Sequence, residues 1–190
     1  MSYLQKLLTR NFVVYFRMVT ITLDEYSCQL EELVEVLNGY TNQHWTLINN
    51  NHYPIGKFED VVIGKTNNMK MKRIVEIHYD IIYSLPKIWF NFYTLDWRRL
   101  TTDEIFNSGF INEAISIQLK SIPTFIITSA ENPITNEPFY HFHACKTEKI
   151  MKNKETFLLR WLSFFGMYIG LNYDILFLTE LINSYAKNII

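Results

Sequence analysis

The feature that most constrains the fold is a stretch near the end of the chain in which almost every position is apolar or aromatic. It spans residues 155–171 and includes Phe157, Leu158, Leu159, Trp161, Leu162, Phe164 and Phe165. A helix that is apolar nearly all round must be buried or covered by further structure. Residues 173–186, with apolar positions at Leu176, Leu178, Leu181, Ile182 and Tyr185, predict a helix that covers it. The chain has 190 residues, which is long enough for one domain with a substantial core.

A second helix is predicted near the start of the chain. Thr22 and Glu25 have the spacing of a capping box, in which each side chain bonds a free backbone N–H of the first turn. Apolar residues follow at helical spacing as far as Leu37, and Asn38-Gly39 ends the run. We expect this helix to pack one face on a sheet. Cys28 lies on it, where a cysteine is usually a small buried hydrophobe.

Four strands are predicted between the two helical regions. They are residues 45–48, 61–63, 73–83 and 87–93, separated by segments rich in turn residues. This order is typical of an antiparallel meander.

The middle of the chain predicts shorter elements. Residues 101–104 open a short helix, 124–128 form an apolar strand, and 129–137 form a loop with Pro133 and Asn136. The aromatic run that begins at Pro138 is strand-like. Together these patterns predict an α+β fold.

Composition excludes several classes of protein. The formal charge of -1 argues against a broad nucleic-acid surface, which needs a basic excess to displace counterions. The basic cluster of Lys65, Lys70, Lys72 and Arg73 is short and is interpreted as a solvated loop or hairpin. No apolar stretch is long enough for a membrane span. Two cysteines do not make a disulfide framework and fit a reducing compartment.

Potentially reactive side chains gather at His141, His143 and Cys145, which alternate along the chain and would project from one face of a strand. Three interpretations remain open. A zinc site lacks a fourth ligand at any recognised spacing. A reactive thiol would gain from a nearby imidazole or ammonium, because either stabilises the nucleophilic thiolate. The third interpretation is structural, with histidines on a half-buried sheet and an inert cysteine.

Two classes of cysteine enzyme do not fit this segment. A cysteine phosphatase is excluded because no glycine-rich anion loop follows Cys145. A papain-type protease would be longer and would place its cysteine at the start of a helix near the mature N-terminus.

Several motifs together resemble the autophagy branch of ubiquitin-conjugating-type (E2-like) enzymes, the families of autophagy-related proteins ten and three. The active-site motif of that branch is matched by His143-Ala144-Cys145-Lys146-Thr147, and its downstream motifs by Trp161-Leu162-Ser163 and Gly170-Leu171-Asn172. Its tyrosine-rich strand, proline turn and apolar strand are matched by residues 79–90. The resemblance covers about residues 22–172 and is closer to the protein-ten family, because the chain has no room for the long insertion expected of protein three. Ala144 departs from the family proline, which would stiffen the turn.

The resemblance implies a ubiquitin-conjugating-enzyme-like fold and a function. Cys145 would accept the ubiquitin-like autophagy-related protein twelve as a thioester from the activating enzyme, autophagy-related protein seven. Cys145 would then pass protein twelve to a lysine of autophagy-related protein five. The reaction would take place in the cytoplasm and would need no cofactor or metal.

The resemblance also implies roles for other residues. The asparagine that ordinary ubiquitin-conjugating enzymes use to stabilise the oxyanion is absent, and Thr128 or Tyr83, the latter at the end of the tyrosine-rich strand, would supply the donor. His143 would orient the loop or bias the thiol, and Lys146 and Thr147 would support it.

From this resemblance we predict two parts of the chain, an N-terminal extension over residues 1–21 and a catalytic domain over residues 22–190. Two alternatives stay open. One is a catalytically inactive domain of the same fold that binds partners, and the other is the related enzyme that conjugates to lipid.

Overall fold

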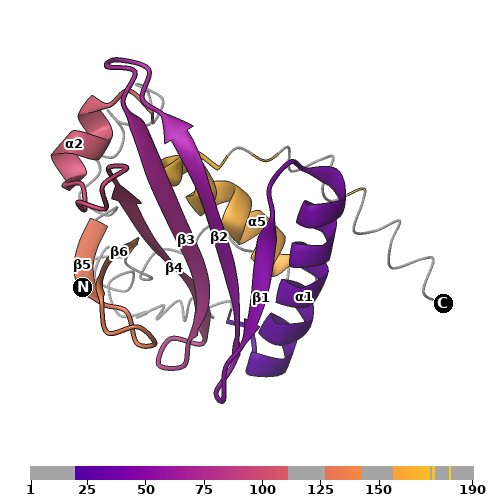
Figure 1. Cartoon of the computed structure of the whole chain (residues 1–190). Helices are drawn as coiled ribbons and strands as arrows, with labels where there is room; N and C mark the ends of the chain where they lie inside the picture. The colour runs from indigo at the N-terminus through magenta and orange to yellow at the C-terminus, as the bar shows by residue number, and fades with distance from the viewer. Residues whose placement is uncertain (1–19, 111–126, 143–155, 172, 174–179, 181–190) are drawn as a thin grey trace, which may run out of the picture.

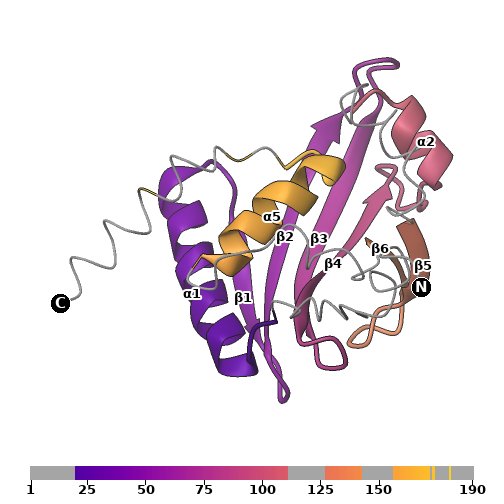
Figure 2. The ribbon, with the colours of Figure 1, turned by 180° about the vertical axis from the view of Figure 1, so that it is seen from behind.

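A single antiparallel sheet forms the body of the protein. The computed structural model describes residues 20–110, 127–142, 156–171, 173 and 180. The sheet has six strands in the order β1-β2-β3-β4-β6-β5, and α1 and α5 pack on one of its faces (Figures 1 and 2). The predicted α+β arrangement of an early helix, an antiparallel meander and a late helix is confirmed. The helices and strands are, in chain order, α1 (Leu23–Tyr40), β1 (Trp45–Asn49), β2 (Pro54–Ile63), β3 (Lys70–Asp80), β4 (Leu85–Tyr93), α2 (Thr102–Asn107), β5 (Ile127–Glu131), β6 (Pro138–Phe142), α5 (Phe157–Gly166) and the 3-10 turn η3 (Met167–Ile169).

Helix α1 begins at the predicted capping box. The Glu25 amide donates to Thr22 Oγ1 at 3.1 Å, and the Thr22 amide donates to Glu25 Oε2 at 2.7 Å. The predicted apolar face is buried apart from the exposed Leu23, and the Tyr26 hydroxyl donates to the Ile77 carbonyl at 2.9 Å. Cys28 is exposed, so the expectation of a buried cysteine is wrong. It follows Tyr26 by two positions, which places it on the opposite side of the helix.

The meander is confirmed, but several strand ends differ from the prediction: β1 ends at Asn49, β3 begins at Lys70 and β4 begins at Leu85. Strand β2 begins at Pro54, although its first half is poor in strand-forming residues, because it pairs with β1 on one side and with β3 on the other. Gly56 permits this packing, since a Cβ there would lie 3.0 Å from Leu30 Cδ1 of α1. Strand β3 ends at Asp80, three residues before the predicted end.

The fifth strand is displaced relative to the sequence prediction. Residues 129–131 were expected in a loop but belong to β5, where Ser129 pairs with Tyr140 and Glu131 with Pro138. The loop is therefore limited to residues 132–137. Residues 124–126 lie outside the described part of the chain, while β6 confirms the strand-like run after Pro138.

The apolar stretch forms α5 and is buried as predicted. Phe165 lies 5.9 Å from Phe142 between ring centroids, and Phe142 lies 5.2 Å from Phe90, so the helix packs on β6 and β4. The helical region ends at Gly170, whose φ of 73° is a left-handed conformation that glycine adopts without strain. The predicted cover helix lies outside the described residues apart from Tyr173 and Glu180.

The start of the described chain joins the same core. Ile21 is buried, its amide donates to the Ser84 carbonyl at 3.1 Å, and its carbonyl accepts from the Tyr79 hydroxyl at 2.9 Å. Among the described helices, none is long and apolar enough to cross a membrane.

Arg73 is buried, so its assignment to a solvated basic cluster is wrong. Only 3% of its surface is exposed. Its guanidinium donates to both carboxylate oxygens of Asp60, at 2.9 and 2.6 Å, and to the Ile169 carbonyl at 2.7 Å. Arg73 alternates with the outward-facing Lys72 along β3, and this alternation explains why neighbouring basic residues have opposite environments. The hairpin part of the prediction holds, since Lys65 lies between β2 and β3.

Replacing Arg73 with methionine should destabilise the protein by ~3 kcal/mol, because it leaves the Asp60 carboxylate and the Ile169 carbonyl without their donor. Lys65→Met makes the same change of charge at an exposed position and should stay within about 0.5 kcal/mol of wild type. Urea unfolding followed by circular dichroism measures both. Equal stability of the two variants would contradict a structural role for the buried guanidinium.

Candidate active site

Strand β6 leads directly to the candidate nucleophile. Its last residue is Phe142, and Cys145 follows three positions later. Three residues span at most about 10 Å, so the position of Phe142 limits where the thiol can lie. His143, Cys145, Lys146 and Thr147 themselves lie outside the described residues.

The β5–β6 hairpin is joined to the rest of the sheet by a short ladder. Strand β6 pairs with β5 over its whole length, whereas its pairs with β4, among the residues that the structure describes, are Trp89↔His141 and Phe90↔Tyr140. By contrast, β3 and β4 pair at nine positions. Contacts other than the backbone ladder must therefore help to fix the hairpin.

His141 is held on the sheet. It is buried, its ring lies 4.9 Å from that of Trp89, and its Nδ1 is 3.3 Å from the Phe142 carbonyl. In the described part of the chain, no three His, Cys, Asp or Glu side chains are grouped as a metal site would require. The other two members of the alternating set, His143 and Cys145, lie outside that part.

Thr128 lies beside β6, where the resemblance needs an oxyanion donor. It is an exposed residue of β5 and pairs directly with His141. Side chains of directly paired residues are about 5 Å apart on one face of a sheet. Thr128 is thus fixed close to the end of the strand that continues toward Cys145.

Tyr83 is not at the end of a strand, as the sequence predicted, but in the turn between β3 and β4. The Asp80 carboxylate accepts from the amides of Ile82 and Tyr83, at 3.1 and 3.2 Å, and so ends the strand. Ser84 completes the reversal with a φ of 52°. Tyr83 is 43% exposed.

The two candidate hydroxyls do not converge. Thr128 pairs with His141, and His141 pairs with Trp89, so these three residues lie in one row across the sheet. Tyr83 lies just before Leu85, the first residue of β4, which is four residues from Trp89 along that strand. Four residues of antiparallel strand extend about 14 Å, and two interstrand spacings of about 4.8 Å add to that separation. Thr128 and Tyr83 are therefore alternative candidates for the oxyanion donor and do not form a joint site.

A buried polar cluster connects the turn of the β5–β6 hairpin to β3. Asn132 Nδ2 donates to Glu76 Oε2 at 2.7 Å, and His78 Nε2 lies 2.9 Å from the same oxygen. Burial alone would raise the pKa of Glu76, but the hydrogen bonds from His78 and Asn132 and the nearby positive charge of Lys57 outweigh it and lower the pKa. The carboxylate is consequently charged at neutral pH.

A second polar cluster lies between β4 and the same hairpin. The fully buried Asn91 donates through Nδ2 to the Pro138 carbonyl at 2.9 Å and accepts from Arg99 Nε at 2.8 Å. Arg99 also donates to Ser129 Oγ at 3.1 Å and lies 3.8 Å from the centre of the Tyr140 ring. These contacts continue the β4–β6 junction beyond its two ladder pairs.

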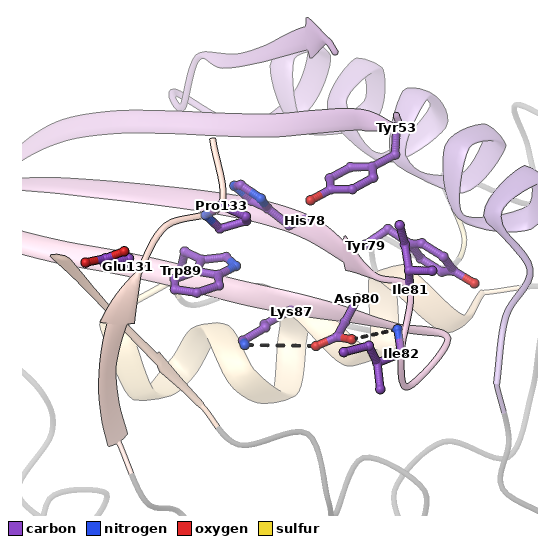
Figure 3. Close-up of a pocket in the computed structure, with 10 residues that line it drawn as sticks. All are labelled: Tyr53, His78, Tyr79, Asp80, Ile81, Ile82, Lys87, Trp89, Glu131 and Pro133. Atoms are coloured by element: carbon purple, nitrogen blue, oxygen red, sulfur yellow. Dashed lines mark hydrogen bonds and ion pairs between the residues drawn. The ribbon is translucent and has the colours of Figure 1, made fainter. Parts of the chain in front are cut away.

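A cavity of about 340 Å³ lies on the sheet face turned away from α5 (Figure 3). Its floor includes Trp89 and His78, and Pro133 of the hairpin loop arches over one side. Lys87 lies 3.9 Å from Asp80 across the rim. Burial lowers the pKa of Lys87, and Asp80 opposes that effect.

Sequence reasoning missed both polar clusters. Glu76 and His78 were absorbed into a β-rich run, and Asn132 into a loop, because their partners are distant in sequence. The one available signal was charged or polar side chains at alternate positions of an otherwise apolar strand.

Comparison with known proteins identifies a family. Residues 51–174 match the family described as autophagocytosis associated protein, active-site domain. The chain is 30% identical over 128 residues to the ubiquitin-like-conjugating enzyme ATG10 of Homo sapiens, covering 60% of this chain and 54% of that protein. It is 30% identical over 121 residues to the protein of the same name in Dictyostelium discoideum, covering 52% of each chain.

The fold is also similar to solved structures. The crystal structure of the autophagic E2 Atg10 superposes with a TM-score of 0.56 at 16% identity, covering 77% of this chain and 94% of that one. This confirms the predicted ubiquitin-conjugating-like fold. The matched region spans about half the length of the human and Dictyostelium relatives.

Glu76 generates a pH prediction. Because its pKa is lowered in the folded protein, its charge contributes stability above the unfolded pKa of about 4.5, and that contribution is lost as the pH falls through the folded pKa. Glu76→Gln should therefore flatten the acid limb of a plot of unfolding free energy against pH between about 5 and 3. Glu31→Gln, on the exposed side of α1, should keep the wild-type limb. Parallel acid limbs for wild type and Glu76→Gln would contradict the assignment.

Proposed function

The chain belongs to the family of autophagocytosis associated proteins that carry this active-site domain, and from that premise we propose that it is an E2-like conjugating enzyme of autophagy. The observation that carries the proposal is the family match over residues 51–174, which includes Cys145 and the strand that leads to it. The proposed activity is transfer of a ubiquitin-like protein through a thioester on Cys145.

The chemistry requires a thiol that serves in two steps. In the first step, the Cys145 thiolate attacks the carbonyl carbon of the thioester on the activating enzyme. A new C–S bond to Cys145 forms, and the cysteine thiolate of the activating enzyme leaves. In the second, a lysine amine of the target attacks the Cys145 thioester, the C–S bond breaks, and the amine loses a proton as the isopeptide bond forms. A thiolate both attacks and leaves readily, which suits each step.

The other cysteine is poorly suited to this role. Partial burial, together with the carboxylates of Glu32 and Glu31, raises the pKa of Cys28. Its sulfur lies 3.8 Å from Glu32 Oε1 on an exposed helix face. A raised pKa reduces the thiolate fraction at neutral pH and therefore the rate of attack.

The oxyanion that forms during aminolysis needs a hydrogen-bond donor. Thr128 is the better supported candidate, since it is exposed and pairs with His141 close to the end of β6. Tyr83 is the alternative, from the β3–β4 turn. His143, Lys146 and Thr147 are assigned to the support of the thiol by the family motif.

The proposed partners are those of the protein-ten branch. They are autophagy-related protein seven as the activating enzyme, autophagy-related protein twelve as the ubiquitin-like protein, and autophagy-related protein five as the target. The names of the human and Dictyostelium relatives support a ubiquitin-like partner. The proposed compartment is the cytoplasm, where a free thiol persists.

Cys145→Ser should abolish loading or trap an ester that resists reductant, because an alkoxide is a poorer leaving group than a thiolate. The measurement is incubation with activating enzyme, ATP and the ubiquitin-like protein, followed by non-reducing gels. Cys28→Ser is the matched control and should load like wild type. Normal loading of Cys145→Ala would refute the proposed function.

Thr128→Val should slow transfer to the lysine more than it slows loading, by on the order of 100-fold, if its hydroxyl is the oxyanion donor. Tyr83→Phe tests the alternative with an equally conservative change. Single-turnover discharge of the preformed thioester onto free lysine measures the effect. Wild-type discharge by both variants and by the double variant would move the donor to the backbone near Cys145.

A further inference from the structure

The β5–β6 hairpin is the part of the sheet whose position is least determined by backbone pairing. Within the described residues its ladder to β4 has two pairs, compared with eight between β2 and β3 and nine between β3 and β4. The side chains that link the hairpin to its neighbours therefore have a large share in its placement.

Asn132 uses both ends of its side-chain amide to link the hairpin loop to β3. Its Oδ1 accepts from the amide of Ile134 at 2.9 Å and so builds the hairpin loop, while its Nδ2 donates to Glu76 Oε2 at 2.7 Å. The two ends of one amide thus join the loop to β3. The side chains of Asn132 and Glu76 are both buried, so water does not compete for the hydrogen bond between them.

Glu76 is itself fixed in place. His78 lies against the same carboxylate oxygen at 2.9 Å, and Lys57 lies 3.9 Å from the other oxygen. The acceptor for Asn132 is therefore held by β2 and β3, which pair with each other at eight positions.

We propose that the Asn132–Glu76 pair is a positioning device for the reaction at Cys145. Its role is to position the hairpin, and we assign it no part in the chemical step. This inference rests on the proposed function. Phe142 is at most about 10 Å of chain from Cys145, so a shift of the hairpin moves the anchor of the reactive segment. A misplacement of about 1 Å from a remote change can cost on the order of 100-fold in rate.

Asn132→Asp separates this role from that of the loop. Aspartate has the same size and keeps the oxygen that accepts from Ile134, but it places a second carboxylate oxygen against Glu76. The repulsion should displace the hairpin, with discharge of the Cys145 thioester onto free lysine slowed by about 10-fold or more.

The reciprocal variant restores the bond in reverse. In Asn132→Asp with Glu76→Gln, the glutamine nitrogen takes the place of Glu76 Oε2 and donates one hydrogen to the aspartate and the other to His78 Nε2, which then accepts as the tautomer protonated at Nδ1. The net charge is that of wild type. We expect discharge within about 3-fold of wild type, because the geometry of the pair is restored.

The control for general destabilisation is Val36→Ala, which removes buried methyl groups from α1. It should lower the melting temperature and leave the discharge rate of the folded protein unchanged. All variants carry Cys28→Ser, so that the rate of Cys145 alkylation by iodoacetamide against pH gives a second readout of the thiol's environment.

Wild-type discharge by Asn132→Asp, or slow discharge that the reciprocal variant does not restore, would overturn the proposal. If Asn132→Asp does not fold, Glu76→Ala alone decides, because it removes the acceptor of Asn132 Nδ2 and keeps the bond from the Ile134 amide to Asn132 Oδ1: slow discharge supports the proposal and wild-type discharge overturns it. A wild-type chain that fails to load at Cys145 refutes the proposed function instead. The pair is then judged by hydrogen exchange of the His141 and Phe142 amides, which Asn132→Asp should accelerate and the reciprocal variant restore.

Discussion

Arg73 connects the elements on which the rest of the structure depends. From β3 it reaches Asp60 on β2 and the carbonyl of Ile169, just beyond α5. A buried guanidinium is costly to desolvate, and three hydrogen bonds to a carboxylate and a carbonyl offset that cost. The interaction therefore fixes where the apolar helix ends relative to the sheet. The apolar side chains of α5 could pack in many registers, and a directional bond at its end selects one of them.

The two halves of the sheet are held by different kinds of interaction. Strands β1 to β4 pair along most of their length and bury apolar side chains against α1 and α5. The β5–β6 hairpin has a short ladder to β4 among the described residues, aromatic contacts of Tyr140 and Phe142 with the core, and two polar clusters at Asn132 and Asn91. The strand that leads to the candidate nucleophile is thus next to the scaffold of β1 to β4 but is supported by different contacts. Active-site segments placed on a rigid scaffold are a general pattern in enzymes.

Local signals predicted the elements well and their long-range contacts poorly. The capping boxes at Thr22 and Thr101 act within four residues, so the sequence alone locates the starts of α1 and α2. The first half of β2 has no comparable local signal, because its pairing with β1 and β3 makes it a strand. Arg73 was placed in a solvated cluster because its partners, Asp60 and Ile169, are 13 and 96 residues away. Of the candidate site, the position of Thr128 on a strand beside His141 follows from pairing, whereas Tyr83 left the predicted strand because the Asp80 carboxylate ends it.

The use of polar rather than apolar contacts to place the hairpin has a physical rationale. Apolar packing is non-directional and tolerates sliding by a methylene or a rotamer, whereas a hydrogen bond at 2.7 Å to a fixed carboxylate tolerates little displacement. Burial makes the loss of this hydrogen bond costly in free energy, since a displaced Asn132 would leave both its amide and the Glu76 carboxylate without that partner in a low dielectric. The proposed function requires large partners to meet the surface of the protein. Under the proposed function, the buried directional bonds from the hairpin to β3 and β4 would help to keep the end of β6 in place during those encounters, in addition to the ladder and the packing of Phe142.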